Sequence, residues 1–265
     1  MALAIALLVV GITTVSVVLF LSRIWWFPPN ISIHGIAVDQ QMILTMICVG
    51  VIFVLAQLSL AYFVWRQRET SGRKVAYSHG NNGLEITWTI ATAIFFIGFG
   101  IMTQDLWARI YYDSAPPDAL RIRVVGKQFA WSFHYSGTDG KFGATHLNLV
   151  DDAAGNPLGL DYDNDPDTAD DIVVPNMGIP VNQPIELILH AMDVTHAYWV
   201  RELRIKQDLV PGLKLKVHFT ATQVGRYEIA CAELCGLGHN KMRAYLDIMS
   251  DQDYIEWLKN RAAEQ

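Results

Sequence analysis

Cysteine and charge are both scarce in this chain. Of its 265 residues only three are cysteine and only 17% are charged, whereas 52% are hydrophobic. A chain of this size with so little charge is too apolar for an ordinary soluble protein. Cys48 falls in a long apolar run, so Cys231 and Cys235 are the only cysteines outside such runs. A domain stapled by several disulfides is therefore excluded.

The apolar residues are concentrated in three runs in the N-terminal part of the chain. They cover residues 1–22, 42–65 and 86–107. Each is about 20 residues long, which is enough for a helix to cross a hydrocarbon core of roughly 30 Å. The sequence therefore predicts three transmembrane helices in a lipid bilayer. The first run has no basic segment before it and no clear cleavage site, so we expect a retained helix; an uncleaved signal-like segment is the alternative.

Basic residues are distributed unevenly around these runs. The loop 66–83 carries four of them against one acid, whereas Arg23 is the only basic residue between the first two runs. Under the positive-inside rule the loop 66–83 lies in the cytoplasm. Everything after about residue 108 is then predicted to lie on the outer face of the membrane.

From residue 119 the pattern changes to short runs rich in β-branched and aromatic residues, with turn residues between them. The clearest runs are 120–125, 129–135, 185–189, 213–220 and 227–230. Their alternation predicts an antiparallel sandwich or Greek-key barrel, for which about 130 residues suffice. The predicted fold class is thus a membrane-anchored all-β protein. Residues 119–250 would form the exported domain and residues 251–265 a C-terminal helix and tail.

An acidic segment interrupts the predicted β domain. Residues 151–171 include eight aspartates and no basic residue. The stretch 161–167 weakly resembles a calcium loop, but Pro166 stands where an EF-hand requires glycine. Three interpretations stay open: a solvated acidic loop, a calcium site, and a docking surface whose clustered charge steers a basic partner.

Metal-binding side chains are densest in the stretch 231–242. It holds two thiols, an imidazole and a thioether, namely Cys231, Cys235, His239 and Met242. Such ligands favour copper over magnesium or calcium, and a Cys, a His and a weak Met are three of the four ligands of a mononuclear blue-copper centre. His196, 35 residues before Cys231, follows a strand-like run and is the candidate for a fourth ligand.

A second cysteine has no use in a mononuclear centre. Two coppers bridged by both sulfurs would leave each metal with one His and one weak axial ligand. A disulfide, a structural zinc site and a copper-delivery protein are the alternatives. Zinc gives Met242 no role and usually takes more closely spaced cysteines. In thioredoxin-type copper-delivery proteins the His follows the cysteines, whereas His196 precedes them.

This set of residues resembles a known family. His196, the stretch 231–239 and Met242 are similar to the binuclear copper A site of subunit II of haem-copper oxygen reductases, the cytochrome c oxidases. The resemblance covers roughly residues 40–260 and implies a cupredoxin-like barrel on two core helices, so that the first apolar run is an extra one. It also implies a subunit of a proton-translocating oxidoreductase. Such a subunit accepts electrons from a cytochrome c type donor and passes them to haem in subunit I, where oxygen is reduced to water.

The resemblance assigns roles to the candidate ligands. In the family two cysteines bridge two coppers, two histidines bind one copper each, and two weak axial ligands complete the set. The corresponding groups here are Cys231, Cys235, His196, His239, Met242 and the backbone carbonyl of Glu233. The carboxylate of Glu233 would also bind a magnesium ion shared with subunit I. Haem and copper B would belong to that partner, so no catalytic oxygen site is expected in this chain.

Three further positions match the family in part. Glu85, at the start of the third apolar run, would mark the cytoplasmic mouth of a proton path into subunit I; an interfacial acid is the alternative. Phe129 stands where the family has the tryptophan at which electrons enter from cytochrome c. Trp131 follows two residues on, and either aromatic is a candidate for that role or simply part of the core.

The expected partners follow from the same resemblance. Asp193 matches a position near the cytochrome c contact, and Lys206 and Asp208 lie in a stretch, 200–212, that resembles the segment packed on subunit I. We therefore expect contacts with subunits I and III, with a soluble or membrane-bound cytochrome c, and with lipid, but none with nucleic acid. The expected location is the inner membrane of a bacterium, with the copper domain on the periplasmic face.

Overall fold

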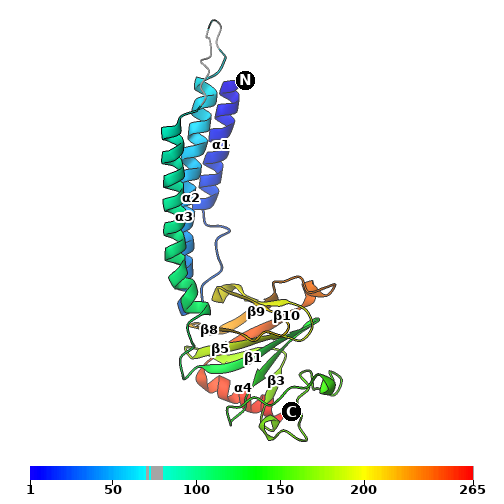
Figure 1. Cartoon of the computed structure of the whole chain (residues 1–265). Coiled ribbons are helices and arrows are strands. Elements are labelled where there is room, and N and C mark those ends of the chain that lie inside the picture. Colours follow the sequence, from blue (N-terminus) through cyan, green and yellow to red (C-terminus); the bar gives the residue numbers. More distant parts are fainter. Residues whose placement is uncertain (70–71, 73–79, 265) are drawn as a thin grey trace. The chain divides into compact units, whose positions relative to one another are not determined.

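The chain forms two compact units. The computed structural model describes residues 1–69, 72 and 80–264 (Figure 1). One unit comprises Met1–Phe27 and Val38–Asp105, and the other comprises Pro28–Ala37 and Leu106–Gln265. The first unit is helical, and the second consists mainly of β-strands.

Within the part of the chain that the structure describes, three helices are long and apolar enough to cross a membrane. They are α1 (Ala2–Leu21), α2 (Ile33–Arg66) and α3 (Asn82–Tyr111). The most apolar stretches of α2 and α3 bury none of their residues inside the protein. Helices that are apolar on all sides and uncovered by protein are stable in lipid, where every backbone hydrogen bond is made within the helix.

Two of these helices are longer than the apolar runs 42–65 and 86–107. The 34 residues of α2 and the 30 of α3 extend about 50 and 45 Å at 1.5 Å per residue, more than a hydrocarbon core of roughly 30 Å. Their ends therefore reach beyond the apolar layer. Half of the basic loop 66–83 lies outside the described residues. The orientation across the membrane therefore stays a prediction.

The second unit contains two five-stranded sheets. In the first sheet the strand order is β3 (Ile172–Val174), β2 (Ala130–Tyr135), β1 (Leu120–Lys127), β5 (Pro184–Ala191) and β8 (Leu215–Thr220). In the second it is β4 (Met177–Pro180), β10 (Arg243–Met249), β9 (Gly225–Cys231), β6 (His196–Val200) and β7 (Ile205–Leu209). Short 3-10 turns lie at η1 (Leu147–Leu149), η2 (Pro166–Thr168), η3 (Arg201–Leu203) and η4 (His239–Lys241).

The core of this unit comes from alternate residues of the strands. Ile122 and Val124 on β1, Leu187 on β5, and Leu246 and Ile248 on β10 are all at most 1% exposed. Successive side chains of a strand point to opposite faces, so the period-two pattern of the sequence buries one face of each sheet.

The prediction of antiparallel sheets is wrong for two strand pairs. β1 and β5 run parallel, and so do β4 and β10. Parallel neighbours need a long connection, and the chain between residues 136 and 183 provides it before β5 returns beside β1. Alternation of apolar residues reports which face of a strand is buried but not the direction of its neighbour.

Helix α4 (Asp251–Ala263) follows β10 directly. The side chain of Ser250 accepts a hydrogen bond from the backbone N–H of Asp253 and caps the start of the helix. The ring of Trp257 packs on Tyr135 of β2, with the ring centroids 5.6 Å apart. The hydroxyl of Tyr135 in turn donates to the backbone oxygen of Gly178 on β4 at 2.8 Å. The helix therefore closes the end of the sandwich at which β2 and β4 meet.

Candidate metal centre

The predicted metal ligands lie at one end of the second sheet. His196 is the first residue of β6 and Cys231 the last of β9, and these two strands are hydrogen-bonded neighbours. Cys235, His239 and Met242 follow in the connection between β9 and β10, with His239 at the start of η4. Strand pairing thus brings a residue that is 35 positions away in the chain to the cysteine loop.

The donor atoms near Cys231 form one set. Its Sγ atom lies 3.9 Å from Nδ1 of His196 and 3.2 Å from the backbone oxygen of Glu233. The Sγ atoms of Cys231 and Cys235 are 3.9 Å apart, well beyond the roughly 2.05 Å of a disulfide. Both thiols are free, which removes the disulfide interpretation.

A second set surrounds Cys235. Its Sγ atom lies 3.6 Å from Nδ1 of His239 and 3.8 Å from Sδ of Met242. Donor atoms that share one four-coordinate metal lie about 3–4 Å apart, because metal–ligand bonds are roughly 2.0–2.3 Å long. Each thiol therefore faces one imidazole and one weak donor, as expected for two metals bridged by two sulfurs.

Four of the donor residues are buried, and His239 and Glu233 are half-buried. His196 is fully buried, Cys235 is 4% exposed and Met242 is 1% exposed. Burial, and then the neighbouring Cys231, raise the pKa of the Cys235 thiol to about 11. A metal that binds at neutral pH must therefore displace the proton of Cys235. Sulfur and imidazole donors of this kind fit copper and do not fit hard cations such as magnesium or calcium.

Asp193 and Gln128 form hydrogen bonds to the residues of the candidate metal centre. Oδ1 of Asp193 lies 2.9 Å from Nε2 of His196, and Oδ2 accepts a hydrogen bond from the backbone N–H of Gln128 at 2.8 Å. The side-chain amide of Gln128 donates to the backbone oxygen of Cys235 at 2.5 Å. Burial acts to raise the pKa of Asp193, but hydrogen bonds from Gln128, His196 and Val194 outweigh it, so the pKa is lowered. A carboxylate on Nε2 leaves Nδ1 of His196 to face the thiols.

The two candidate aromatic residues have different surroundings. Phe129 is 39% exposed, and its ring lies against the cysteine loop, because a Cβ added to Gly238 would stand 2.5 Å from two of its ring carbons. Trp131 is only 3% exposed, with its ring centroid 6.2 Å from that of His196. Phe129 thus forms part of the outer surface over the loop, whereas Trp131 belongs to the core.

The residues predicted to contact subunit I lie beside the metal centre. Lys206 and Asp208 are on β7, which pairs with β6, and their side chains form an ion pair of 2.7 Å. Both are nearly half exposed. The hydrogen bond to Asp208 raises the pKa of Lys206, to which Glu233 contributes through its charge. Glu233 thus has its backbone oxygen at the thiols and its carboxylate near an exposed charged pair.

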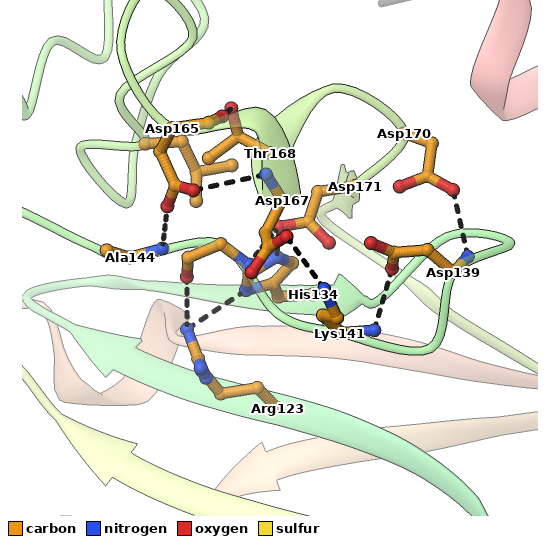
Figure 2. A network of polar contacts seen from close by, with 12 residues as sticks. Arg123, His134, Asp139, Lys141, Ala144, Asp165, Asp167, Thr168, Asp170 and Asp171 are labelled. Atoms are coloured by element: carbon orange, nitrogen blue, oxygen red, sulfur yellow. Dashed lines mark hydrogen bonds and ion pairs between the residues drawn. The ribbon is translucent and has the colours of Figure 1, made fainter.

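The acidic segment is held mainly by its own aspartates (Figure 2). Asp165 and Asp170 accept hydrogen bonds from backbone N–H groups of nearby loop residues, and Asp171 accepts one from Gly143 at 2.8 Å. Asp171 also pairs with Nε2 of His134 at 2.7 Å, with both side chains fully buried. Among the described residues, no group of three ligand atoms within 4.8 Å includes these aspartates. The contacts favour a structured loop over a calcium site.

Sequence patterns did not predict the contacts of Gln128 or the pair of His134 and Asp171. Both connect residues that are far apart in the chain, and no local motif marks them. Glu85, the remaining candidate, lies in the first turn of α3 and belongs to the helical unit. The predicted metal ligands, in contrast, are all brought together in the β unit.

These features define a class: a membrane protein that carries, in a β-sandwich, a buried site of thiols, imidazoles and a thioether. Residues 120–249 match the family described as "Cytochrome C oxidase subunit II, periplasmic domain". The "Alternative cytochrome c oxidase subunit 2" of Bradyrhizobium diazoefficiens is 31% identical over 260 residues, which are 97% of this chain and 92% of that protein. The chain belongs to the cytochrome c oxidase subunit II family.

Two further proteins to which this chain is similar are a curated relative and a solved structure. The cytochrome c oxidase subunit 2 of Cereibacter sphaeroides is 25% identical over 222 residues, 81% of this chain and 72% of that protein. A crystal structure of the periplasmic domain of subunit II of cytochrome oxidase (CoxB) of Bradyrhizobium japonicum aligns with a TM-score of 0.42 and 27% identity. It covers 57% of this chain and 99% of that one.

The family predicted from the sequence is therefore confirmed. So is the fold class, with apolar helices followed by a β domain of the cupredoxin-like subunit II type. The chain is a subunit of an oxidoreductase complex, and its described residues include one buried His–Cys–Cys group with the geometry of a metal site.

Proposed function

We propose that this chain receives electrons for a cytochrome c oxidase at a binuclear copper A centre. The proposed ligands are Cys231, Cys235, His196, His239, Met242 and the backbone oxygen of Glu233. Electrons would come from a cytochrome c type donor and go to haem in subunit I, where oxygen is reduced to water and protons are translocated. The observation that carries the proposal is the division of six donors into two equivalent sets, one around each thiol.

Two bridged coppers, when bound, supply a one-electron redox centre in which both metals share the charge. The role of the chain is to hold the donors still. His196 and Cys231 lie on paired strands, and the backbone N–H of Cys231 donates to the oxygen of Met242 at 3.1 Å. Burial keeps water out. Ligands fixed by a packed sheet change little between oxidation states, and electron transfer is then fast.

We infer that electrons enter across Phe129. Its exposed ring lies against Gly236 and Gly238 of the cysteine loop, and Leu234 and Leu237 of the same loop are 78% and 102% exposed. Together they offer an apolar surface to a donor, with Asp193 nearby. Phe129→Ala should slow electron transfer from the donor about tenfold and leave the copper spectrum intact, whereas Trp131→Ala should disturb the site itself. Equal donor kinetics in Phe129→Ala and the unchanged protein would contradict this route.

Contacts with the rest of the oxidase complete the proposal. Lys206 and Asp208 would face subunit I, and the carboxylate of Glu233 would bind the shared magnesium ion between them. Glu85 would serve a proton path on the cytoplasmic side. Subunit III is a further expected partner. The β domain would lie on the periplasmic face of a bacterial inner membrane, which the description of the matching family as a periplasmic domain supports.

Copper content and electron paramagnetic resonance test the proposal directly. The full-length chain in detergent, loaded with copper, should bind two coppers that share one unpaired electron. Cys231→Ser should abolish this signal, and the matched control Cys48→Ser, in the membrane helix α2, should retain it. A single copper with a mononuclear signal, or preferential binding of zinc by these thiols, would contradict the proposal.

A further inference from the structure

Two histidines that the proposed function does not use lie together on the β unit. His34 is in the first turn of α2, in the part of that helix that belongs to the β unit, and His218 is on β8. Their ring centroids are 5.5 Å apart, and the ring planes are at 78° to each other. Both residues are half-buried.

His34 is held in place by the segment before it. The backbone N–H of Ile31 donates to the oxygen of Glu202 at 3.0 Å, and the N–H of Thr222 donates to the oxygen of Ile31 at 2.8 Å. Ile31 is fully buried, and Ser32 donates from its hydroxyl to the oxygen of Leu203 at 2.8 Å. The position of His34 beside His218 is therefore set by a packed and hydrogen-bonded backbone.

Both imidazoles have a buried nitrogen that lacks a partner. Nδ1 of His34 and Nε2 of His218 make no hydrogen bond within the described part of the chain. A neutral imidazole has one donor and one acceptor nitrogen, and buried polar atoms nearly always have a partner. Two such atoms in adjacent rings point to a missing ligand common to both.

A carboxylate stands next to this pair. Glu186 on β5 is the register partner of His218 on β8, so the two side chains share a face of the sheet at the spacing of directly paired residues. Glu186 is only 9% exposed, and its Oε1 accepts a hydrogen bond from Lys216 at 3.1 Å. The carboxylate is thus held by Lys216 on the face of the sheet that it shares with His218.

The distance between the rings fits a shared metal ion. Two imidazoles bound to one tetrahedral metal at about 2.0–2.1 Å have ring centroids roughly 5 Å apart, close to the 5.5 Å observed here. Imidazole and carboxylate ligands without sulfur suit zinc or a similar divalent ion. Glu186 and His218 also line a cavity of about 820 Å³, which gives an ion a path to the site.

We propose that His34 and His218, with Glu186, bind a divalent zinc ion that ties the segment Pro28–Ala37 to β8. The only described group with three ligand atoms already within 4.8 Å is the one at the copper site. Glu186 must therefore turn away from Lys216 as the zinc binds. The ion and Lys216 compete for the same carboxylate.

Calorimetric titration with zinc tests this site. The full-length chain, without a polyhistidine tag and with its copper centre already filled, should bind one further zinc ion. His34→Gln and His218→Gln should each weaken binding at least tenfold, whereas His146→Gln, an exposed histidine elsewhere on the β unit, should not change it. The copper spectrum of each variant reports that the β unit is folded.

The variant Lys216→Met gives a second test, in which the affinity for zinc should rise and not fall. Removing the competing ammonium group frees Glu186, so zinc should bind severalfold more tightly, a gain that misfolding cannot produce. Absence of zinc binding to the copper-filled chain, or unchanged binding when His34 and His218 are both replaced by glutamine, would overturn the proposal. So would weaker zinc binding in a folded Lys216→Met variant.

Discussion

At the scale of single residues, the position of His196 depends on Asp193. The carboxylate accepts from Nε2 of the ring, while its second oxygen and the side chain of Gln128 connect the ring to the carbonyl of Cys235. One aspartate and one glutamine thus join three segments of chain around the centre. Partners of this kind orient metal-binding histidines and tune their basicity.

Asp193→Asn keeps the size of this side chain and removes its charge. Two coppers should still bind, but the reduction potential should rise by roughly 40 mV, because a charged hydrogen bond to His196 exceeds a neutral one by about 1 kcal/mol. A redox titration of the copper signal measures this shift. Asp163→Asn, an exposed aspartate of the acidic segment, is the control, and equal potentials in the two variants would rule out the positioning role.

At the scale of elements, the acidic segment is stabilised by its charged aspartates. Hydrogen bonds from the side chain and then the backbone of Thr138 lower the pKa of Asp170, and those from Asn164 lower the pKa of Asp161. A carboxyl group with a lowered pKa in the folded protein contributes stability above its unfolded pKa of about 3.9. It loses that contribution as the pH falls through the folded value.

Thermal unfolding of the β unit should therefore depend on pH in a defined direction. The melting temperature should be flat above about pH 5 and should fall below about pH 4, where these carboxylates take up protons. Asp170→Asn should melt lower than the unchanged protein at pH 7 and decline less on acidification. Circular dichroism melts of the chain in detergent measure both effects. A decline of unchanged size in Asp170→Asn would show that this carboxylate does not contribute.

At the scale of the whole molecule, the membrane-spanning helices and the candidate metal site lie in different units. The helical unit carries apolar side chains on all sides, whereas the β unit holds the thiols and imidazoles. Glu85 stands out in the helical unit, because an acid at the start of a membrane helix is costly unless it is solvated or functional.

Glu85→Gln distinguishes these two roles in the assembled oxidase. If Glu85 serves a proton path, turnover should fall several-fold while copper content and donor kinetics stay unchanged. Glu69→Gln, an exposed acid in the loop before α3, is the matched control. Oxygen consumption at saturating donor measures the effect. Turnover equal to that of the control would leave Glu85 as an interfacial acid.

Much of the fold and the site could be predicted from particular residues. Four of the candidate ligands could be predicted because Cys231, Cys235, His239 and Met242 lie within twelve residues of the sequence. The parallel pairing of β1 with β5 was not, because apolar alternation carries no information on strand direction. The hydrogen bond from Gln128 to the backbone oxygen of Cys235 could not be predicted either. The sequence of a turn does not indicate whether the side-chain amide of a glutamine binds water or a carbonyl group.

By itself the sequence determined the three apolar helices and the types of metal donor, because the length of a run and the chemistry of neighbouring side chains are local properties. Only the tertiary structure decided which donors face each other, that Phe129 lies outside and Trp131 inside, and that His34 meets His218. These outcomes depend on strand pairing and packing between residues far apart in the chain. The interactions that stabilise these arrangements form only once the strands have paired and the two sheets have packed.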